Sequence, residues 1–294
     1  MSGRPFAPLD DTPQRDYSGK LRSFEAFVAP ELAQIIDDVM IDRHAAVLDL
    51  CCGAGLVTDQ LTVRGALVVG LDLAAAHARA AADRAGSAAI LVADGTELPF
   101  KDEAFDVVWS CNTVNHFADP ITTLHDVGRT LRPNGRLVVA QSSLLPEMMF
   151  AWDYHFDARI RAACHAYYRQ KHGLTETDTA GSMRLLGLVR DAGFATTRAR
   201  TYVIERFAPL SPNDRTYFLW FFRNYWGPKL RPHLTETDWQ QLGMACDPES
   251  PFFCLDRPDF HHIQTLTVVE GRRVSRSQPQ AHAAAIPFAR SSAT

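Results

Sequence analysis

The stretch Val47-Leu48-Asp49-Leu50-Cys51-Cys52-Gly53-Ala54-Gly55 decides the fold of this chain. It begins with apolar residues typical of a buried strand and ends in a turn of small residues, after which residues 56–61 are expected to begin a helix. Gly53 and Gly55 lack a Cβ, so the turn can adopt unusual φ values and a ligand can approach its backbone. A strand, a glycine turn and a helix N-terminus in this order predict a ligand cradle.

Four further apolar runs predict strands, and helical segments separate them. Asp72 ends the first of these runs, residues 67–72. It lies about 20 residues after the turn, where dinucleotide folds place a carboxylate on a ribose. Asp119-Pro120 predicts an N-cap with proline at the first helical position. The turn Leu131-Arg132-Pro133-Asn134-Gly135 starts the fifth strand. The four runs are residues 67–72, 89–95, 105–110 and 136–140. This alternation indicates a parallel sheet with helices on both faces, joined by right-handed crossovers.

The order of these motifs resembles the class I S-adenosylmethionine (SAM) dependent methyltransferases, of the small-molecule type found in the ubiquinone pathway and in natural-product biosynthesis. Residues 45–143 carry the resemblance, and weaker similarity continues to about residue 270. A dinucleotide oxidoreductase is an alternative for the first motif only, because it would not explain Asp94-Gly95 or the turn before the fifth strand. The resemblance implies an α/β fold with a doubly wound, Rossmann-like sheet of seven strands, of which the last is antiparallel.

The resemblance also implies SAM as cofactor and assigns residues to each part of it. The backbone N–H groups of Gly53 and its turn would hold the amino-acid end, and Asp49 would orient the methionine portion. The carboxylate of Asp72 would accept two hydrogen bonds from the ribose hydroxyls. Asp94 would contact the adenine amino group, with Gly95 beside the ring. For each acid the alternative is a helix cap or a loop contact. The expected cofactor-binding residues are Tyr17, Asp49, Cys51, Gly53, Gly55, Asp72, Leu73, Asp94, Gly95, Ser110 and Asn112.

Cys51 departs from the family, which usually has glycine at this first small position of the turn. Cysteine is small, so we expect cofactor binding to survive with a slightly displaced backbone. A redox role for Cys51 or Cys52 is open, but burial as a small apolar side chain is favoured. The six cysteines do not follow a zinc-site spacing, and reduced thiols are expected.

Catalysis of methyl transfer requires alignment of the nucleophile, and a general base only if the nucleophile arrives protonated. The segment 110–117 lies where the family places the transferred methyl group and the substrate. His116 is the nearest titratable group there and is our candidate catalytic residue. The alternative is a histidine that packs or positions the cofactor. No metal site is expected, since the only grouped candidates, around His261-His262, lie in one loop.

Two insertions and the N-terminal segment are expected to form a helical cap over the core. Residues 1–44 predict N-terminal helices, the second beginning at Pro30. The resemblance implies that such helices cover the SAM site, and Tyr17 is the candidate there to reach the cofactor; the alternative is a tyrosine that packs at the helix start. Residues 144–173 and 206–260 interrupt the strand–helix alternation. The core continues in residues 174–205 and in a last strand at 261–270, and the tail 271–294 is expected to be disordered.

Aromatic residues are concentrated in the two insertions, which contain four of the five tryptophans, Trp152, Trp220, Trp226 and Trp239. Aromatic side chains in a cap suit an enclosed pocket for a flat or apolar organic molecule. They equally suit the core of an added helical layer or the interface of a homodimer. The three alternatives remain open from the sequence.

Charge and hydropathy exclude several classes of partner. The net charge is −4, with 34 acids against 30 Lys and Arg, which argues against a nucleic acid substrate. The segment Ser110-Cys111-Asn112-Thr113 also lacks the paired prolines of nucleic acid amino-methyltransferases. No apolar run is long enough to span a membrane. No apolar leader region follows Met1, so a cytoplasmic location without a signal peptide is expected.

The function expected from the resemblance is transfer of a methyl group from SAM to an O, N or C nucleophile of a small organic metabolite. Natural-product biosynthesis is the expected setting. One alternative is an enzyme that binds SAM but performs other chemistry, such as a cyclase. Another is a SAM-binding partner protein without catalytic activity. The binding motifs are common to all three.

Overall fold

The computed structural model describes residues 18–142, 149–173 and 181–273, and Tyr17 lies outside them. The strands are β1 (Ala46–Leu50), β2 (Leu67–Asp72), β3 (Ala89–Val92), β4 (Phe105–Cys111), β5 (Leu131–Ser142), β6 (Met149–Phe150), β7 (Phe194–Phe207) and β8 (His261–Arg273). The α-helices are α1 (Ser18–Val39), α2 (Leu56–Val63), α3 (Ala75–Arg84), α4 (Pro120–Thr130), α5 (Tyr154–His172), α6 (Leu185–Asp191), α7 (Pro212–Phe221), α8 (Gly227–Leu230) and α9 (Glu236–Cys246).

One sheet holds all the described strands, and its order confirms the doubly wound α/β fold. The strands follow the order β3-β2-β1-β4-β5-β8, and β7 pairs with the outer edge of β8. β1 to β5 are parallel, whereas β8 runs antiparallel to both β5 and β7. The two-residue β6 adds to β8 beyond the end of β5. The order reverses direction at β1, so the carboxyl ends of β1 and β4 flank the point where such folds bind ligands.

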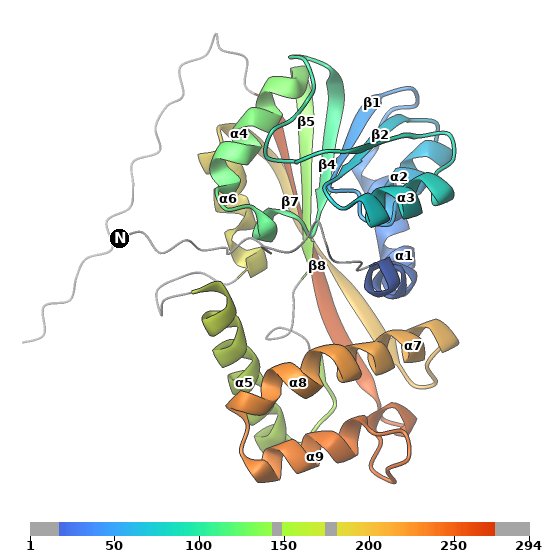
Figure 1. Ribbon diagram of the computed structural model, residues 1–294, viewed down its shortest axis with the longest axis vertical. Coiled ribbons are helices and arrows are strands. Elements are labelled where there is room, and N and C mark those ends of the chain that lie inside the picture. Colours follow the sequence, from blue (N-terminus) through green and yellow to red (C-terminus); the bar gives the residue numbers. More distant parts are fainter. Residues whose placement is uncertain (1–17, 143–148, 174–180, 274–294) are drawn as a thin grey trace, which may run out of the picture.

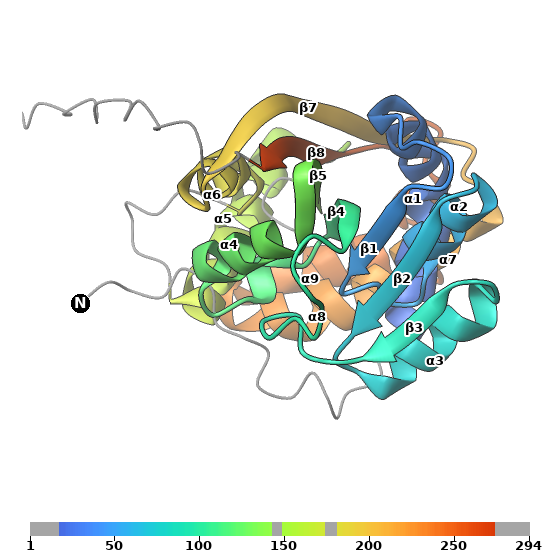
Figure 2. The ribbon, with the colours of Figure 1, turned by 90° about the horizontal axis from the view of Figure 1, so that it is seen from above.

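Helices cover both faces of the parallel part of the sheet (Figure 2). On one face α1 and α2 pack against strand residues such as Val47, Val107 and Val138. On the other face α4 and α6 pack against the alternate residues, such as Leu48, Val108 and Leu137. Both faces are therefore buried, which explains why these strands are continuous apolar runs.

The N-terminal segment forms one helix where the sequence predicted two. α1 continues through Pro30, which we expected at the first turn of a second helix. A proline inside a helix removes one backbone N–H donor. Here the carbonyl of Phe27, in the turn before Pro30, accepts a hydrogen bond from the Arg206 guanidinium. The same guanidinium donates to Glu31 at 2.6 Å, so tertiary contacts on both sides of Pro30 support the helix.

The fifth strand begins earlier than predicted, because the expected turn lies inside it. β4 and β5 pair at Phe105 with Leu131 and then at Val107 with Arg136, so the intervening residues of β5 bulge out of the ladder. Asn134 adopts a left-handed φ of 64° in this bulge, as expected for turn chemistry. β8 likewise extends to Arg273, past the predicted end at residue 270.

A second group of helices, α5 and α7 to α9, lies beyond the ends of β7 and β8, which run from one part of the molecule to the other (Figure 1). The aromatic residues of the insertions form much of the interior there. Phe150, Phe156, Phe218, Phe222 and Phe260 are all buried, and Trp152, Trp220 and Trp239 pack partly buried against them. Among the alternatives from the sequence, these side chains build the core of the cap. The side chain of Trp226 lies outside the described residues.

Candidate functional site

The turn after β1 is built from left-handed residues, as the small-residue pattern required. Cys51, Gly53 and Gly55 have φ values of 59°, 56° and 84°. A Cβ on Gly55 would lie 2.7 Å from the Cα of Ala81, so this glycine lets α3 pack directly on the turn. Cys51 is held in a conformation that costs a side-chain-bearing residue roughly 1–2 kcal/mol. Cys51 thus has the left-handed backbone conformation that glycine would favour, at the position where the family usually has glycine.

Asp72 lies at the centre of the hydrogen bonds between the turn, β2 and α3. Its Oδ2 accepts from the N–H of Gly53 at 2.9 Å. Its Oδ1 accepts from the N–H of Ala74 at 2.9 Å and lies 3.2 Å from the Nδ1 of His77. The Asp72 side chain is buried, so these hydrogen bonds satisfy polar atoms that would otherwise be buried without partners. The N–H of Gly53, which the sequence assigned to the amino-acid end of the cofactor, is therefore already engaged by Asp72.

Asp49 is a buried carboxyl group beneath the turn. Its Oδ2 accepts a hydrogen bond from the hydroxyl of Thr58 at 2.6 Å. Burial, together with the nearby charges of Glu25 and Asp72, raises the pKa of Asp49 to about 7 against the opposing effect of the Thr58 hydrogen bond. Asp49 therefore titrates near neutral pH in the protein without its ligand.

Asp94 and Gly95 follow β3, which is separated from β1 by β2, and Gly95 lies close to the glycine turn. The exposed Asp94 accepts from the N–H and the hydroxyl of Thr96, both at 2.8 Å, so it makes the loop contact that was its alternative role. A Cβ on Gly95 would lie 3.0 Å from Leu50 Cδ1 and 3.2 Å from Cys51 Sγ. The two turns thus approach each other closely, as a shared binding edge requires.

A polar cluster joins the carboxyl ends of β4 and β5. Asn112 Oδ1 accepts from the N–H and hydroxyl of Ser142, at 2.7 and 2.8 Å, and from Gln141 Nε2 at 3.2 Å. Ser110 and Gln141 are buried, and within the described part of the chain the Ser110 hydroxyl and the Gln141 Oε1 have no hydrogen-bond partner. Unpaired buried polar atoms are costly, so this edge offers hydrogen-bonding capacity to a ligand.

The remaining predicted residues lie at the same edge of the sheet or outside it. Leu73 directly follows Asp72 and is about one-third exposed. His116 ends a short 3₁₀ helix (Val114–His116) after β4 and is exposed. Burial raises the pKa values of the Cys51 and Cys52 thiols, which fits packing better than thiolate chemistry. All six cysteines, each within the described residues, are free.

The residues around His261 do not converge on a metal site. His261 Nε2 lies 2.7 Å from Glu205, and Asp259 pairs with Arg257. In the described ranges 18–142, 149–173 and 181–273, no group of three or more His, Cys, Asp or Glu side chains is arranged to hold a metal ion. None of the helices in those ranges is both long enough and apolar enough to cross a membrane.

The structure adds two residues to the site that the sequence analysis did not single out. Glu25 on α1 is buried beside the glycine turn and is paired with Arg84, the last residue of α3. A signal for Glu25 was present, because it interrupts the apolar stripe of α1 between Phe24 and Val28. Arg84 carried no local signal, since its role depends on how α3 packs on the turn.

Comparison with known proteins places the core in a family. Residues 48–139 match the model of a methyltransferase domain. Over 97 residues the chain is 35% identical to the demethylmenaquinone methyltransferase of Corynebacterium kroppenstedtii, covering 33% of this chain and 42% of that protein. Over 107 residues it is 33% identical to the 27-O-demethylrifamycin SV methyltransferase of Amycolatopsis mediterranei, covering 34% and 39%. The chain thus matches less than half the length of these relatives.

Solved structures share the fold over nearly the whole chain. The [4+2]-cyclase SpnF aligns with a TM-score of 0.54 at 17% identity, covering 93% of this chain and 99% of that one. The phosphoethanolamine N-methyltransferase 2 of Haemonchus contortus, solved with SAM, aligns with a TM-score of 0.52 at 14% identity, covering 94% and 60%. Identities this low show the fold alone. The domain match, the relatives at 33–35% identity and the motifs around the glycine turn show that residues 48–139 form a methyltransferase domain of the class I, SAM-dependent family.

Proposed function

We propose that the chain transfers a methyl group from SAM to an O, N or C nucleophile of a small organic metabolite, in natural-product biosynthesis. The observation that carries the proposal is the convergence of Asp49, Asp72 and the glycine turn inside the matched domain. The relative from Amycolatopsis, whose name specifies a rifamycin, supports the biosynthetic setting.

The residues present fit this cofactor. SAM supplies a methyl group already activated on a sulfonium. The turn after β1 and the carboxylates of Asp49 and Asp72 form an acceptor-rich edge, which suits a ligand with cationic groups and ribose hydroxyls. Ser110 and Gln141 offer unpaired polar atoms at the adjoining strand ends.

The protein's own contribution would be binding, alignment and exclusion of water. The carboxylate of Asp72 accepts hydrogen bonds at the carboxyl end of β2, and Asn112 fixes the ends of β4 and β5 relative to each other. His116, in the segment after β4, is the proposed base for a nucleophile that arrives protonated. It would take the proton that the nucleophile loses as its bond to the methyl carbon forms.

The test is incubation of the purified protein with SAM carrying an isotopically labelled methyl group and an extract of its source organism. Mass spectrometry is expected to find a product heavier by the labelled methyl, with an equal amount of S-adenosylhomocysteine. The Asp72→Ala variant serves as the control and should form far less of both. If SAM binds but is not consumed in any extract, the methyl-transfer proposal is overturned, and other chemistry or a non-catalytic role takes its place.

A further inference from the structure

Glu25 connects three elements at the glycine turn. It lies on α1 with 9% of its surface exposed, an unusual burial for a glutamate. The guanidinium of Arg84, at the end of α3, donates to its carboxylate. The same guanidinium donates to the carbonyl of Ala54 at 3.2 Å. A carboxylate from the N-terminal helix is therefore held against the turn between β1 and α2.

The backbone N–H groups of this turn are engaged by the protein itself. The N–H groups of Leu56 and Ala54 face the carboxylate of Glu25 and stabilise its charged form. Gly53 donates to Asp72, as described above. Cys52 donates to the carbonyl of Leu71 at 2.9 Å, and Gly55 to the carbonyl of Cys52 at 3.0 Å. The N–H donors of residues 52–56 are thus paired with acceptors of the protein, and carboxyl groups lie among those acceptors.

Carboxyl groups outnumber basic groups among the described buried side chains around the turn, where His77 accompanies three acids. Glu25, Asp49 and Asp72 all lie there, and burial raises the pKa of Glu25 despite its pairing with Arg84. Glu25 and Asp72 in turn raise the pKa of Asp49. A cationic group placed among these carboxylates would lower the electrostatic free energy of the site.

We propose that Glu25, held by Arg84 over the first turn of α2, is a cofactor-binding residue that receives the α-ammonium group of the amino-acid end. This inference rests on the proposed function, since it concerns the cofactor of the same site. It assigns recognition of that end to α1 in addition to the glycine turn. The core and the N-terminal helix would then be coupled through the cofactor.

The test compares two nucleosides that differ only at the end in question. S-Adenosylhomocysteine carries the amino-acid end, whereas 5′-deoxy-5′-methylthioadenosine keeps the adenosine and the thioether but lacks it. Isothermal titration calorimetry of Glu25→Gln should show S-adenosylhomocysteine bound about tenfold more weakly than by the wild type. Binding of methylthioadenosine should change less than about twofold.

Glu31→Gln is the matched control. Glu31 lies on the same helix, is similarly buried and is paired with Arg206 at 2.6 Å, but it faces β7 instead of the turn. It should leave both affinities unchanged. Equal weakening of both nucleosides by Glu25→Gln would show that Glu25 only holds α1 in place. No change in either, or tighter binding of S-adenosylhomocysteine, would also overturn the inference. If the wild type binds neither nucleoside, the proposed cofactor itself fails.

Discussion

Asp72 combines a proposed role in ribose binding with hydrogen bonds that hold the glycine turn and the start of α3 together. Replacing it by Ala removes the acceptor proposed for the ribose and leaves the N–H groups of Gly53 and Ala74 without their partner. We expect Asp72→Ala to weaken SAM binding at least about tenfold, equivalent to ~1.4 kcal/mol. We also expect a loss of roughly 1–3 kcal/mol in the free energy of unfolding. Calorimetric titration and chemical denaturation measure the two effects.

Asp72→Asn separates the two effects, because the amide keeps one acceptor oxygen for the backbone. It should recover part of the stability while SAM still binds more weakly than to the wild type. Unchanged SAM affinity in both variants would remove Asp72 from the cofactor site.

Asp49 makes stability depend on pH in the protein without ligand. Its pKa is raised from an ordinary value of 3.8 to about 7, so the folded state keeps a proton that the unfolded state has released. The stability it contributes is full below about pH 4 and is lost as the pH rises through about 7. Asp49→Asn cannot titrate and keeps an acceptor for Thr58. The free energy of unfolding of Asp49→Asn minus that of the wild type should therefore increase by roughly 1–3 kcal/mol from pH 5 to pH 8.

Chemical denaturation at pH 5, 6.5 and 8 checks this dependence. Asp94→Asn is the control, since it removes an exposed carboxylate that accepts hydrogen bonds from Thr96 and leaves the buried carboxyl of Asp49 in place. Parallel pH dependences for Asp49→Asn and the wild type would contradict the raised pKa.

At the level of elements, the close contact between the glycine turn and α3 requires that residue 55 carries no side chain. Gly55→Ala places a Cβ 2.7 Å from Ala81 at a φ of 84°. Gly193→Ala is a matched control, with a φ of 88° and, among the described residues, no atom within 4 Å of the added Cβ apart from its chain neighbours. Both variants incur the left-handed penalty of roughly 1–2 kcal/mol. Only Gly55→Ala adds the clash, which should cost a further ~1–3 kcal/mol in the free energy of unfolding.

Thermal and chemical denaturation compare these two variants directly. Gly55→Ala should also weaken cofactor binding, because α3 must move away from the turn. Equal destabilisation by the two substitutions would show that α3 adjusts without cost.

The element boundaries show which features of the secondary structure local sequence patterns predict correctly. The strand before the glycine turn, the strand ending at Asp72 and the helix after Asp119-Pro120 follow from apolar runs and capping, and the structure confirms them. The break expected at Pro30 is wrong, because the Arg206 contacts that support the helix there come from β7, more than 170 residues away. The string Leu-Thr-Glu-Thr-Asp, which predicts a helix start, occurs at residues 174–178 and 234–238. The second copy begins α9, with Thr235 as its N-cap, and the first lies outside the described residues.

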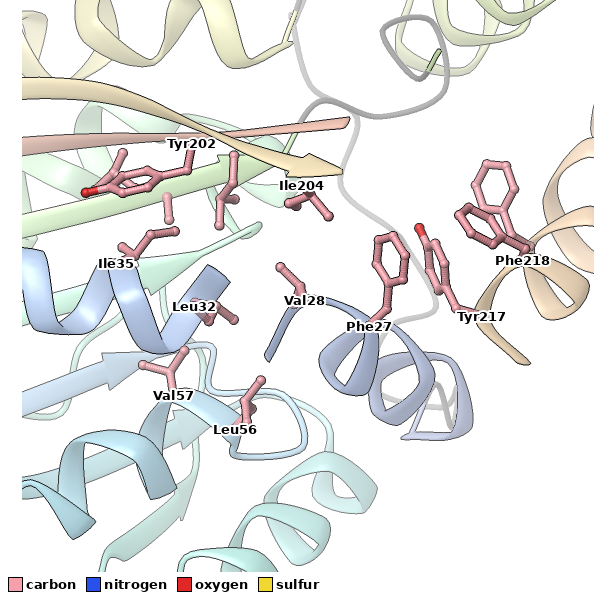
Figure 3. Packing of buried hydrophobic residues seen from close by; sticks show 14 of the residues in the cluster. Phe27, Val28, Leu32, Ile35, Leu56, Val57, Tyr202, Ile204, Tyr217 and Phe218 are labelled. Atoms are coloured by element: carbon pink, nitrogen blue, oxygen red, sulfur yellow. The ribbon is translucent and has the colours of Figure 1, made fainter. Parts of the chain in front are cut away.

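For the whole molecule, α1 joins the methyltransferase core to the cap. Figure 3 shows its apolar side chains between three elements. Leu32 and Ile35 face α2 and β7, while Phe27 stacks on Tyr217 of α7 with ring centroids 4.0 Å apart. The guanidinium of Arg206 lies 4.6 Å from the centre of the Phe27 ring. The helix that carries Glu25 is therefore fixed by both parts of the molecule. The homodimer considered from the sequence stays a prediction.

Phe27→Ala tests this connection. Phe27 is 1% exposed, so its truncation should lower the free energy of unfolding by about 3–5 kcal/mol. It should also separate the unfolding of the cap from that of the core in denaturation followed by tryptophan fluorescence and circular dichroism. Phe252→Ala, at a 66% exposed position in the second insertion, should change stability by less than about 0.5 kcal/mol. A single unchanged transition for Phe27→Ala would show that α1 does not couple the two parts.

By itself, the sequence determined the parallel core, the glycine turn and the acids at the ends of β1, β2 and β3, because each depends on neighbours within a strand, a turn or one helical face. Only the tertiary structure decided which groups meet. Glu25 and Arg84 reach the turn from different helices, and Asp72 takes the Gly53 N–H that the sequence had left for the ligand. The aromatic residues likewise pack as the cap's interior, since their burial depends on where β7 and β8 carry the insertions. Such contacts join residues far apart in the chain, and no local pattern specifies them.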